Sequence, residues 1–284
     1  MKRSEKLGMF TGLVVGVLLL LISVFMIFQT TCKVWGAEKP ANATQQGIDV
    51  SSHQGKIDWE QVKNSALADY AIIRCGYGVN QTDKDDKYWD YNSSECERLG
   101  IPYGTYLYSG ADTTAKAKSE AEHVVRLLQG KNLTYPIYYD MEADMLNQLS
   151  STQIGNIAKT FLNTMESYGY KNVAVYSNKY LFETKLTASV FSDYPKWIAQ
   201  HSNKCTYQGS YHMWQYSTQG VIPGISEKVD LNYKIGNWTY AGYSSAKKTV
   251  VVKPKATTIK SLRKSGKKAV KITYKKVSGV SGYQ

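Results

Sequence analysis

Residues 136–142 read PIYYDME, a short apolar run that ends in two acidic residues. From Gly47 onward, runs of this kind alternate with amphipathic stretches. Short apolar runs bounded by turn residues are typical of buried strands. Eight strands are therefore expected, over residues 47–52, 70–78, 102–110, 135–142, 172–178, 196–202, 212–217 and 229–234.

The amphipathic stretches predict helices over residues 58–67, 86–99, 114–129 and 151–168. The clearest is 151–168, which Ser150 or Ser151 can cap and Gly169 can end. Its apolar residues recur every three or four positions: Ile154, Ile157, Ala158, Phe161, Leu162 and Met165. Alternating strands and helices indicate a parallel sheet with crossover helices, and eight strands in so short a span favour a closed α/β barrel.

Four acidic residues lie at or near predicted strand ends, where barrels of this class carry their active sites. Asp140 and Glu142 are two residues apart, so a strand directs both to one face. Two carboxyls so close raise the pKa of one, which leaves an acid beside a carboxylate, as glycosidases require. Taken alone, the pair also fits a metal site or a solvated edge. Asp49 also fits a helix cap, and Asp230 a turn.

Five segments in a fixed order carry a family resemblance over about residues 46–236. They are GIDVSSHQG at 47–55 with IDW at 57–59, PIYYDME at 136–142, WIAQ at 197–200, WQYS at 214–217, and GVIPGI at 220–225 followed by VDLN at 229–232. In this order they resemble the lysozymes of glycoside hydrolase family 25.

The resemblance implies a flattened TIM-like barrel with eight strands and about five helices. It also implies a muramidase that cleaves the β-1,4 bond between N-acetylmuramic acid and N-acetylglucosamine in peptidoglycan. Glu142 would be the proton donor, and Asp140 would stabilise developing charge or polarise the N-acetyl group of the sugar. Asp49 and Asp230 would line the same cleft. Spacing leaves the nucleophile open, and we favour the acetamido oxygen of the substrate over a carboxylate.

Five further residues are expected to contact substrate: Tyr106, Tyr108, Trp197, Trp214 and Gln215. For the aromatic residues among them, core packing is the alternative. Many relatives carry a large polar or aromatic residue where Leu107 stands, which puts the sugar contacts of that strand in doubt. His123 is expected at the surface of its helix. The His and Cys residues have no metal-ligand spacing, so no metal and no cofactor are expected.

The net charge of +12 comes almost wholly from the C-terminal part of the chain. Residues 237–284 hold 12 Lys or Arg and no acidic residue, whereas residues 47–236 are mildly acidic. This division argues against a globular nucleic-acid-binding domain. The basic tail could bind anionic wall polymers, or its lysines could be the solvated faces of a β-module.

The rest of the chain divides into four further segments. Residues 1–37 hold basic residues and an apolar run from Met9 to Phe28, typical of a cleaved signal peptide or a retained membrane anchor. Residues 38–46 and 238–252 are expected to be linkers around a barrel at 47–237. Residues 253–284 resemble the opening strands of a fibronectin type III-like module, incomplete in this sequence.

We therefore expect a secreted or wall-associated monomeric enzyme that binds peptidoglycan glycan strands. A non-catalytic wall-binding protein on the same barrel, or a glycosidase for another polymer such as chitin, are the alternatives. Three cysteines follow the segment at 1–37, an odd number without a CxxC pair, which excludes a disulfide scaffold. Cys75 and Cys96 could pair or remain buried thiols.

Overall fold

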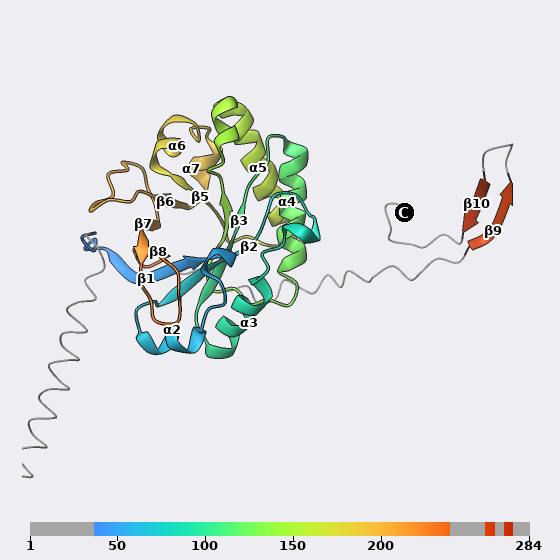
Figure 1. Ribbon diagram of the computed structural model, residues 1–284. Coiled ribbons are helices and arrows are strands. Elements are labelled where there is room, and N and C mark those ends of the chain that lie inside the picture. The colour runs from blue at the N-terminus through green and yellow to red at the C-terminus, as the bar shows by residue number, and fades with distance from the viewer. Residues whose placement is uncertain (1–36, 239–258, 265–269, 275–284) are drawn as a thin grey trace, which may run out of the picture. The chain divides into compact units, whose positions relative to one another are not determined.

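The structure, a computed structural model, describes residues 37–238, 259–264 and 270–274. Its larger unit contains a closed barrel of eight strands, which confirms the predicted fold class (Figure 1). The strands follow each other around the barrel in chain order: β1 (Ala43–Val50), β2 (Tyr70–Tyr77), β3 (Tyr103–Tyr108), β4 (Ile137–Asp140), β5 (Val173–Asn178), β6 (Lys196–Ala199), β7 (Met213–Gly220) and β8 (Val229–Ile235).

The direction of the last strand is a feature that the sequence does not predict. Neighbouring strands from β1 to β7 are parallel, whereas β8 is antiparallel to both β7 and β1. The short connection at 221–228 has no crossover helix, so β7 and β8 form a hairpin. β1 begins at Ala43, four residues before the expected start, because Gln46 and its neighbours pair with β8.

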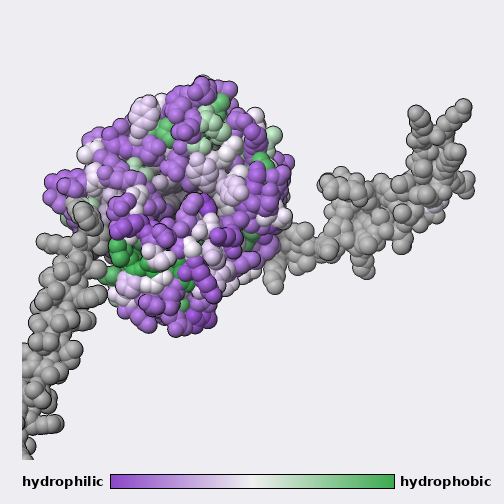
Figure 2. Space-filling view, in the orientation of Figure 1, coloured by the Kyte–Doolittle hydropathy of each residue, from purple (hydrophilic) through white to green (hydrophobic). Residues whose placement is uncertain are grey.

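Six α-helices lie in the part of the chain that the structure describes, close to the expected five. They are α2 (Trp59–Ser65), α3 (Trp89–Leu99), α4 (Thr114–Leu127), α5 (Ser151–Ser167), α6 (Lys179–Thr184) and α7 (Val190–Asp193). α4 and α5 lie side by side against the barrel (Figure 1). Ser150 caps α5, and the predicted apolar stripe of this helix is buried. Hydrophilic residues cover most of the face seen in Figure 2.

Two apolar clusters pack on opposite faces of the sheet. The larger lies between the sheet and the helices, and the smaller lies inside the barrel around Tyr138, Tyr176 and Trp197. Leu107 is fully buried in the larger cluster, while its neighbours Tyr106 and Tyr108 occupy the other face of β3. The expected effect of Leu107 on sugar contacts is therefore wrong, because its side chain faces away from the barrel interior.

Several strands are shorter than the sequence predicts at their C-terminal ends. β4 stops at Asp140 rather than at 142, and β6 stops at Ala199 rather than at 202. Glu142 therefore lies two residues beyond its strand, just before a short 3-10 helix, η3 (Asp144–Gln148). Leaving the strand early frees Glu142 from the strict two-residue alternation that the sequence argument used.

The thiols and the second unit complete the description. Cys75 and Cys96 are free and buried, so of the two alternatives the buried-thiol one holds. The second unit is an antiparallel hairpin of β9 (Ile259–Lys264) and β10 (Val270–Tyr274), strands within the segment assigned to a fibronectin-like module. The expected signal segment and the second linker lie largely outside the described residues. Within the described ranges, no helix has the length and hydropathy to cross a membrane.

Candidate active site

The four acidic residues singled out by sequence meet at one end of the barrel. Asp49 and Asp140 lie near the C-terminal ends of β1 and β4, and Glu142 follows β4. Asp230 lies near the start of β8, and because β8 is antiparallel, this start lies at the same end. Asp49 and Asp230 stand directly opposite each other in the pairing of β1 with β8.

Two side-chain amides, one from β7 and one from β8, donate hydrogen bonds to Asp49. Gln215 Nε2 donates to Asp49 Oδ2 at 3.0 Å, and Asn232 Nδ2 donates to the same oxygen at 2.7 Å. Trp197 Nε1 donates to Asn232 Oδ1 at 2.8 Å, which fixes the amide with its nitrogen toward Asp49. Trp197 thus fills the barrel interior and also orients a polar group.

Burial raises the pKa values of both the Asp49 and the Asp230 carboxyl. Burial raises the pKa of Asp49 well above its usual range, and the charge of Asp230 adds to the effect, against the two amide hydrogen bonds. Burial raises the pKa of Asp230 to about 6. The contact between these two carboxyls raises the pKa of Asp49 and lowers that of Asp230.

In the second pair of carboxyls, Asp140 and Glu142, Asp140 is the more enclosed, with only 2% of its surface exposed. Burial raises its pKa well above the usual range, and the charges of Glu142 and Asp49 act in the same direction. The Arg74 guanidinium opposes them, although Arg74 is itself paired with Asp86 at 2.9 Å. Oδ1 of Asp140 is buried and has no hydrogen-bond partner among the described residues.

Glu142 is only partly buried, so it is easier to reach than Asp140. Burial and the charge of Asp49 raise its pKa, while a hydrogen bond with Tyr176 and the charge of His201 lower it. A carboxyl with a raised pKa retains its proton closer to neutral pH, as a general acid must. The arrangement therefore places a reachable carboxyl beside a buried one, both with a raised pKa.

The substrate-contact candidates take different places in the structure. Tyr106 and Tyr108 are half-buried on the inner face of β3, whereas Trp197 is buried beneath the acidic residues. Trp214 is fully buried in the larger apolar cluster, where its indole donates to the Gln200 carbonyl oxygen at 2.8 Å. The core-packing alternative therefore accounts for Trp214, which has no exposed surface to line a cleft.

Gln215 lies at the centre of the site. Besides donating to Asp49, it accepts from the Tyr176 hydroxyl and lies within hydrogen-bonding distance of His201 Nε2, both at 3.0 Å from its Oε1. These contacts fix the direction of the amide without reference to a ligand. Gln215 thus joins the Asp49 pair to Tyr176, which contacts Glu142.

Four residues of the site were missed by the sequence argument: Arg74, Tyr176, His201 and Asn232. Asn232 was within reach, since it lies two residues after Asp230 on the same strand. Arg74 and Tyr176 lie inside predicted strands but read as ordinary strand residues. Among the described residues, no group of three or more His, Cys, Asp or Glu side chains has the arrangement of a metal site.

A closed α/β barrel with paired carboxyls of raised pKa at the C-terminal ends of its strands is an arrangement that suits a glycoside hydrolase. The chain belongs to glycosyl hydrolases family 25, whose sequence model matches residues 48–225.

Relatives agree with this assignment. The autolytic lysozyme of Clostridium acetobutylicum is 30% identical over 188 residues, which cover 66% of this chain and 55% of that protein. The modular autolysin LytC from Streptococcus pneumoniae has a TM-score of 0.61 at 33% identity, over 66% of this chain and 46% of that one. This chain therefore spans about half the length of these two relatives. LytC has also been solved in complex with a synthetic peptidoglycan ligand.

The same fold recurs at lower identity. A family 25 glycosyl hydrolase from Bacillus anthracis has a TM-score of 0.62 at 20% identity, over 72% of this chain and 95% of that one. The match covers almost the whole of that chain and shows a likeness of fold.

Proposed function

We propose that this protein is a peptidoglycan hydrolase of the N-acetylmuramidase type. It would cleave the β-1,4 bond between N-acetylmuramic acid and N-acetylglucosamine. Membership of family 25 supports glycoside hydrolysis, and the lysozyme and autolysin relatives favour peptidoglycan as substrate. The observation that carries the proposal is the convergence of Asp49, Asp140, Glu142 and Asp230 in one buried acidic site.

Glu142 acts as the proton donor in this mechanism. Its carboxyl transfers a proton to the glycosidic oxygen as the bond from that oxygen to the anomeric carbon breaks. Its partial exposure lets a sugar oxygen approach, and its raised pKa keeps the proton available. In the second half of the reaction the Glu142 carboxylate removes a proton from water, which restores the acid.

Asp140 assists the attack of the substrate's own acetamido group. The acetamido carbonyl oxygen bonds to the anomeric carbon, and the acetamido N–H donates to a carboxylate that stabilises the resulting positive charge. We assign this role to Asp140, which ends β4 two residues before Glu142. Water then attacks the anomeric carbon, the bond to the acetamido oxygen breaks, and the free reducing sugar is released.

The remaining residues position these groups. Asp49 and Asp230 lie at the same end of the barrel, the charge of Asp49 raises the pKa of Asp140 and Glu142, and Gln215 orients Asp49. Tyr106 and Tyr108, half-buried on the inner face, are proposed to contact sugar rings. Trp197 supports the site from below through Asn232, and Trp214 supports β7 from the helix side.

We also propose where the protein is located and how it attaches to the cell wall. The export-type segment at 1–37 and the autolytic relatives favour a secreted or wall-associated protein. The basic residues of the tail are proposed to contact anionic wall polymers, and residues 253–284 to open a fibronectin type III-like module.

Digestion of purified peptidoglycan, followed by mass spectrometry of the new reducing ends, tests the function. The proposal requires N-acetylmuramic acid at the new reducing ends. N-acetylglucosamine at those ends would assign the enzyme to the other glycosidic bond. Cleavage of chitin but not peptidoglycan would change the substrate. Wall binding without any cleavage would identify a non-catalytic protein.

A further inference from the structure

A β-bulge near the end of β2 changes the direction of the side chains that follow it. Arg74 pairs with Tyr106, but Gly76, not Cys75, pairs with Leu107, so β2 contains one residue more than β3. Cys75 is buried in the outer apolar cluster. A Cβ on Gly76 would lie 2.9 Å from the His123 ring on α4, so Gly76 also faces the helices. Because two successive side chains face outward, each side chain after them lies on the face opposite to the one that regular alternation predicts.

The bulge places Tyr77 on the inner face of the sheet, where regular alternation would have sent it outward. Tyr77 pairs with Tyr108, and Tyr108 pairs with Asp140, so the three residues form one row across β2, β3 and β4. Adjacent strands lie about 4.8 Å apart, so Tyr77 stands about 10 Å along the sheet from Asp140. A glycan strand that runs from Asp140 along this row would therefore pass over Tyr77.

The exposure of the row changes along its length. Asp140 is buried, Tyr108 is half-buried, and Tyr77 is 42% exposed at the barrel rim. Burial and the charges of Asp140 and Glu142 raise the pKa of Tyr108, which places its ring beside the acidic pair. Tyr77 thus extends an aromatic surface from the acidic site outward to solvent.

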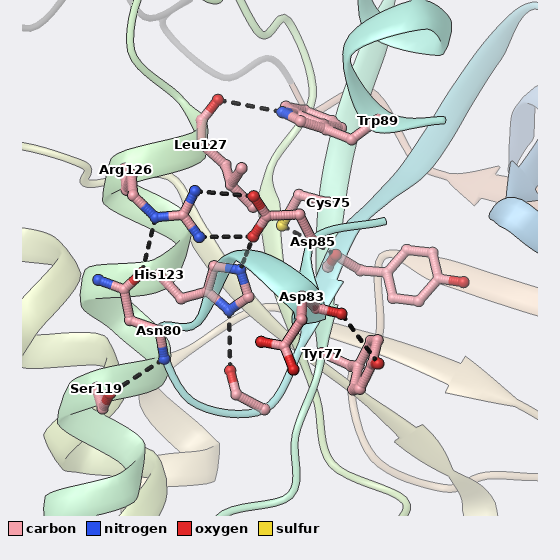
Figure 3. A network of polar contacts seen from close by, with 12 residues as sticks. Cys75, Tyr77, Asn80, Asp83, Asp85, Trp89, Ser119, His123, Arg126 and Leu127 are labelled. Atoms are coloured by element: carbon pink, nitrogen blue, oxygen red, sulfur yellow. Dashed lines mark hydrogen bonds and ion pairs between the residues drawn. The ribbon is translucent and has the colours of Figure 1, made fainter. Parts of the chain in front are cut away.

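A buried polar network holds the bulge from the helix side (Figure 3). His123, which the sequence argument placed at the surface, is fully buried, and that expectation is wrong. Its Nδ1 lies 3.0 Å from the Gly78 carbonyl oxygen, and its Nε2 lies 2.7 Å from Asp85 Oδ1. Arg126 Nη1 donates to Asp85 Oδ2 at 2.9 Å. His123 is buried because it fastens the strand that follows the bulge.

The same network reaches the bulged residues and Tyr77 itself (Figure 3). Asp85 forms an isolated bridge with Gly76, and the Asp86 amide donates to the Cys75 carbonyl oxygen at 2.9 Å. The Tyr77 hydroxyl donates to the Asp83 carbonyl oxygen at 3.4 Å. The satisfied buried groups of this network specify the arrangement of the bulge, and Tyr77 adds an exposed contact to the segment that follows.

We propose that Tyr77, together with Tyr108, forms a binding platform for the pyranose rings of the glycan strand that leads away from the cleavage site. The proposal rests on the glycan-hydrolysing function proposed above and adds a residue that the family motifs do not include. Pyranose rings carry C–H groups on their faces and hydroxyls on their edges. Tyrosine offers a matching apolar face with a polar tip. The platform would bind the glycan strand without taking part in proton transfer.

The test is a calorimetric titration of the full chain with peptide-free peptidoglycan glycan chains, in a Glu142→Gln background that prevents cleavage. Tyr77→Ala should weaken binding about tenfold, the loss expected when one stacked ring is removed. Tyr77→Phe keeps the ring face and should bind within about twofold of the parent. Tyr168→Ala is the matched control, because Tyr168 is 45% exposed and follows α5 at the opposite end of the barrel.

The outcomes separate this proposal from the proposed function. Weaker binding by Tyr77→Ala alone supports the platform. Equal binding by Tyr77→Ala and the parent, or no measurable binding by the parent, overturns it. Cleavage of the same glycan chains by the protein with Glu142 intact is measured in parallel. If the glycan chains are cleaved but Tyr77→Ala binds them as well as the parent does, the platform is rejected and the function stands. If the glycan chains are not cleaved but Tyr77→Ala binds them less well, the function is rejected and the platform stands.

Discussion

The side-chain amide of Asn232 donates to Asp49 Oδ2 over 2.7 Å, across the line where β8 closes the barrel against β1. The strand that completes the fold therefore also completes the acidic site. The same amide accepts from Trp197 Nε1, so one buried side chain joins β8 to both β1 and β6. The closure of the barrel and the arrangement of the acidic site consequently depend on the same contacts of Asn232.

Replacing Asn232 with Leu should lower both stability and activity. Asp49 would lose one of its two amide donors, and the Trp197 indole N–H would lose its acceptor in a buried site. Each buried polar group left unpaired costs about 1–3 kcal/mol. Urea unfolding measures the loss of unfolding free energy. Asn163→Leu, at an exposed position on α5, is the control and should change it by less than about 0.5 kcal/mol. Similar values for both variants would contradict the account.

The pKa of Asp230 predicts a pH-dependent gain of stability on substitution. Folding raises this pKa from 3.8 to about 6, so the folded protein binds the proton more tightly than the unfolded chain. The contribution of Asp230 to the free energy of unfolding therefore falls as pH rises from about 4 to about 6. Asp230→Asn removes this loss. As pH rises across that interval, the melting temperature of the variant should therefore increase relative to that of the parent.

Asp58→Asn provides a control of opposite sign. Asp58 caps α2, and hydrogen bonds from Gln61 lower its pKa, so ionised Asp58 stabilises the folded state above its unfolded pKa. Replacing Asp58 should reduce the melting temperature relative to the parent at neutral pH, and the difference should shrink in acid. If the difference in melting temperature between Asp230→Asn and the parent stayed constant from about pH 4 to about pH 7, the raised pKa of Asp230 would be refuted.

The fold and the acidic centre could be read from sequence because both depend on local periodicity. Strand runs, the α5 stripe and the two-residue spacing of Asp140 and Glu142 are visible in any single segment. All four carboxyls met as expected, since strand ends at one rim of a barrel are close together.

What the sequence did not reveal depends on contacts between distant segments. The bulge at Cys75 and Gly76 reverses the face of Tyr77, and one extra residue leaves no local pattern. Trp197 and Trp214 begin similar motifs, yet strand register places one inside the barrel and the other outside it. His123 resembles a surface residue until Asp85 is brought to it from 38 residues away.

Full activity is expected after exhaustive treatment with EDTA. Proton transfer by Glu142 and attack by the substrate's acetamido group require no metal ion. Initial rates on peptidoglycan before and after chelation, with magnesium, calcium and zinc added back separately, measure this directly. A loss of activity that one of these ions restores would contradict the prediction.

A chain that ends after Trp238 should retain turnover on soluble glycan chains. Trp238 Nε1 donates to the His212 carbonyl oxygen at 3.1 Å, and the Lys234 ammonium lies 4.4 Å from the centre of its ring. A chain that ends after Gly236 lacks these contacts and should melt at a lower temperature. If the basic tail binds wall polymers, both shortened chains should bind intact walls less well than the full chain at low salt, and the difference should fade as salt rises. Loss of turnover in the chain ending after Trp238 would move the domain boundary.

The initial rate of reducing-end release by Glu142→Gln tests the central claim most directly. Glutamine is nearly the same size as glutamate but cannot protonate the leaving oxygen, and general acid catalysis contributes about 10²–10⁴-fold. Asp144→Asn, at an exposed acidic residue in η3, controls for the loss of one nearby charge. The account predicts a rate at least about 100-fold lower for Glu142→Gln and a nearly unchanged rate for Asp144→Asn, with both proteins folded. A Glu142→Gln variant that clears peptidoglycan at the parent rate would contradict it.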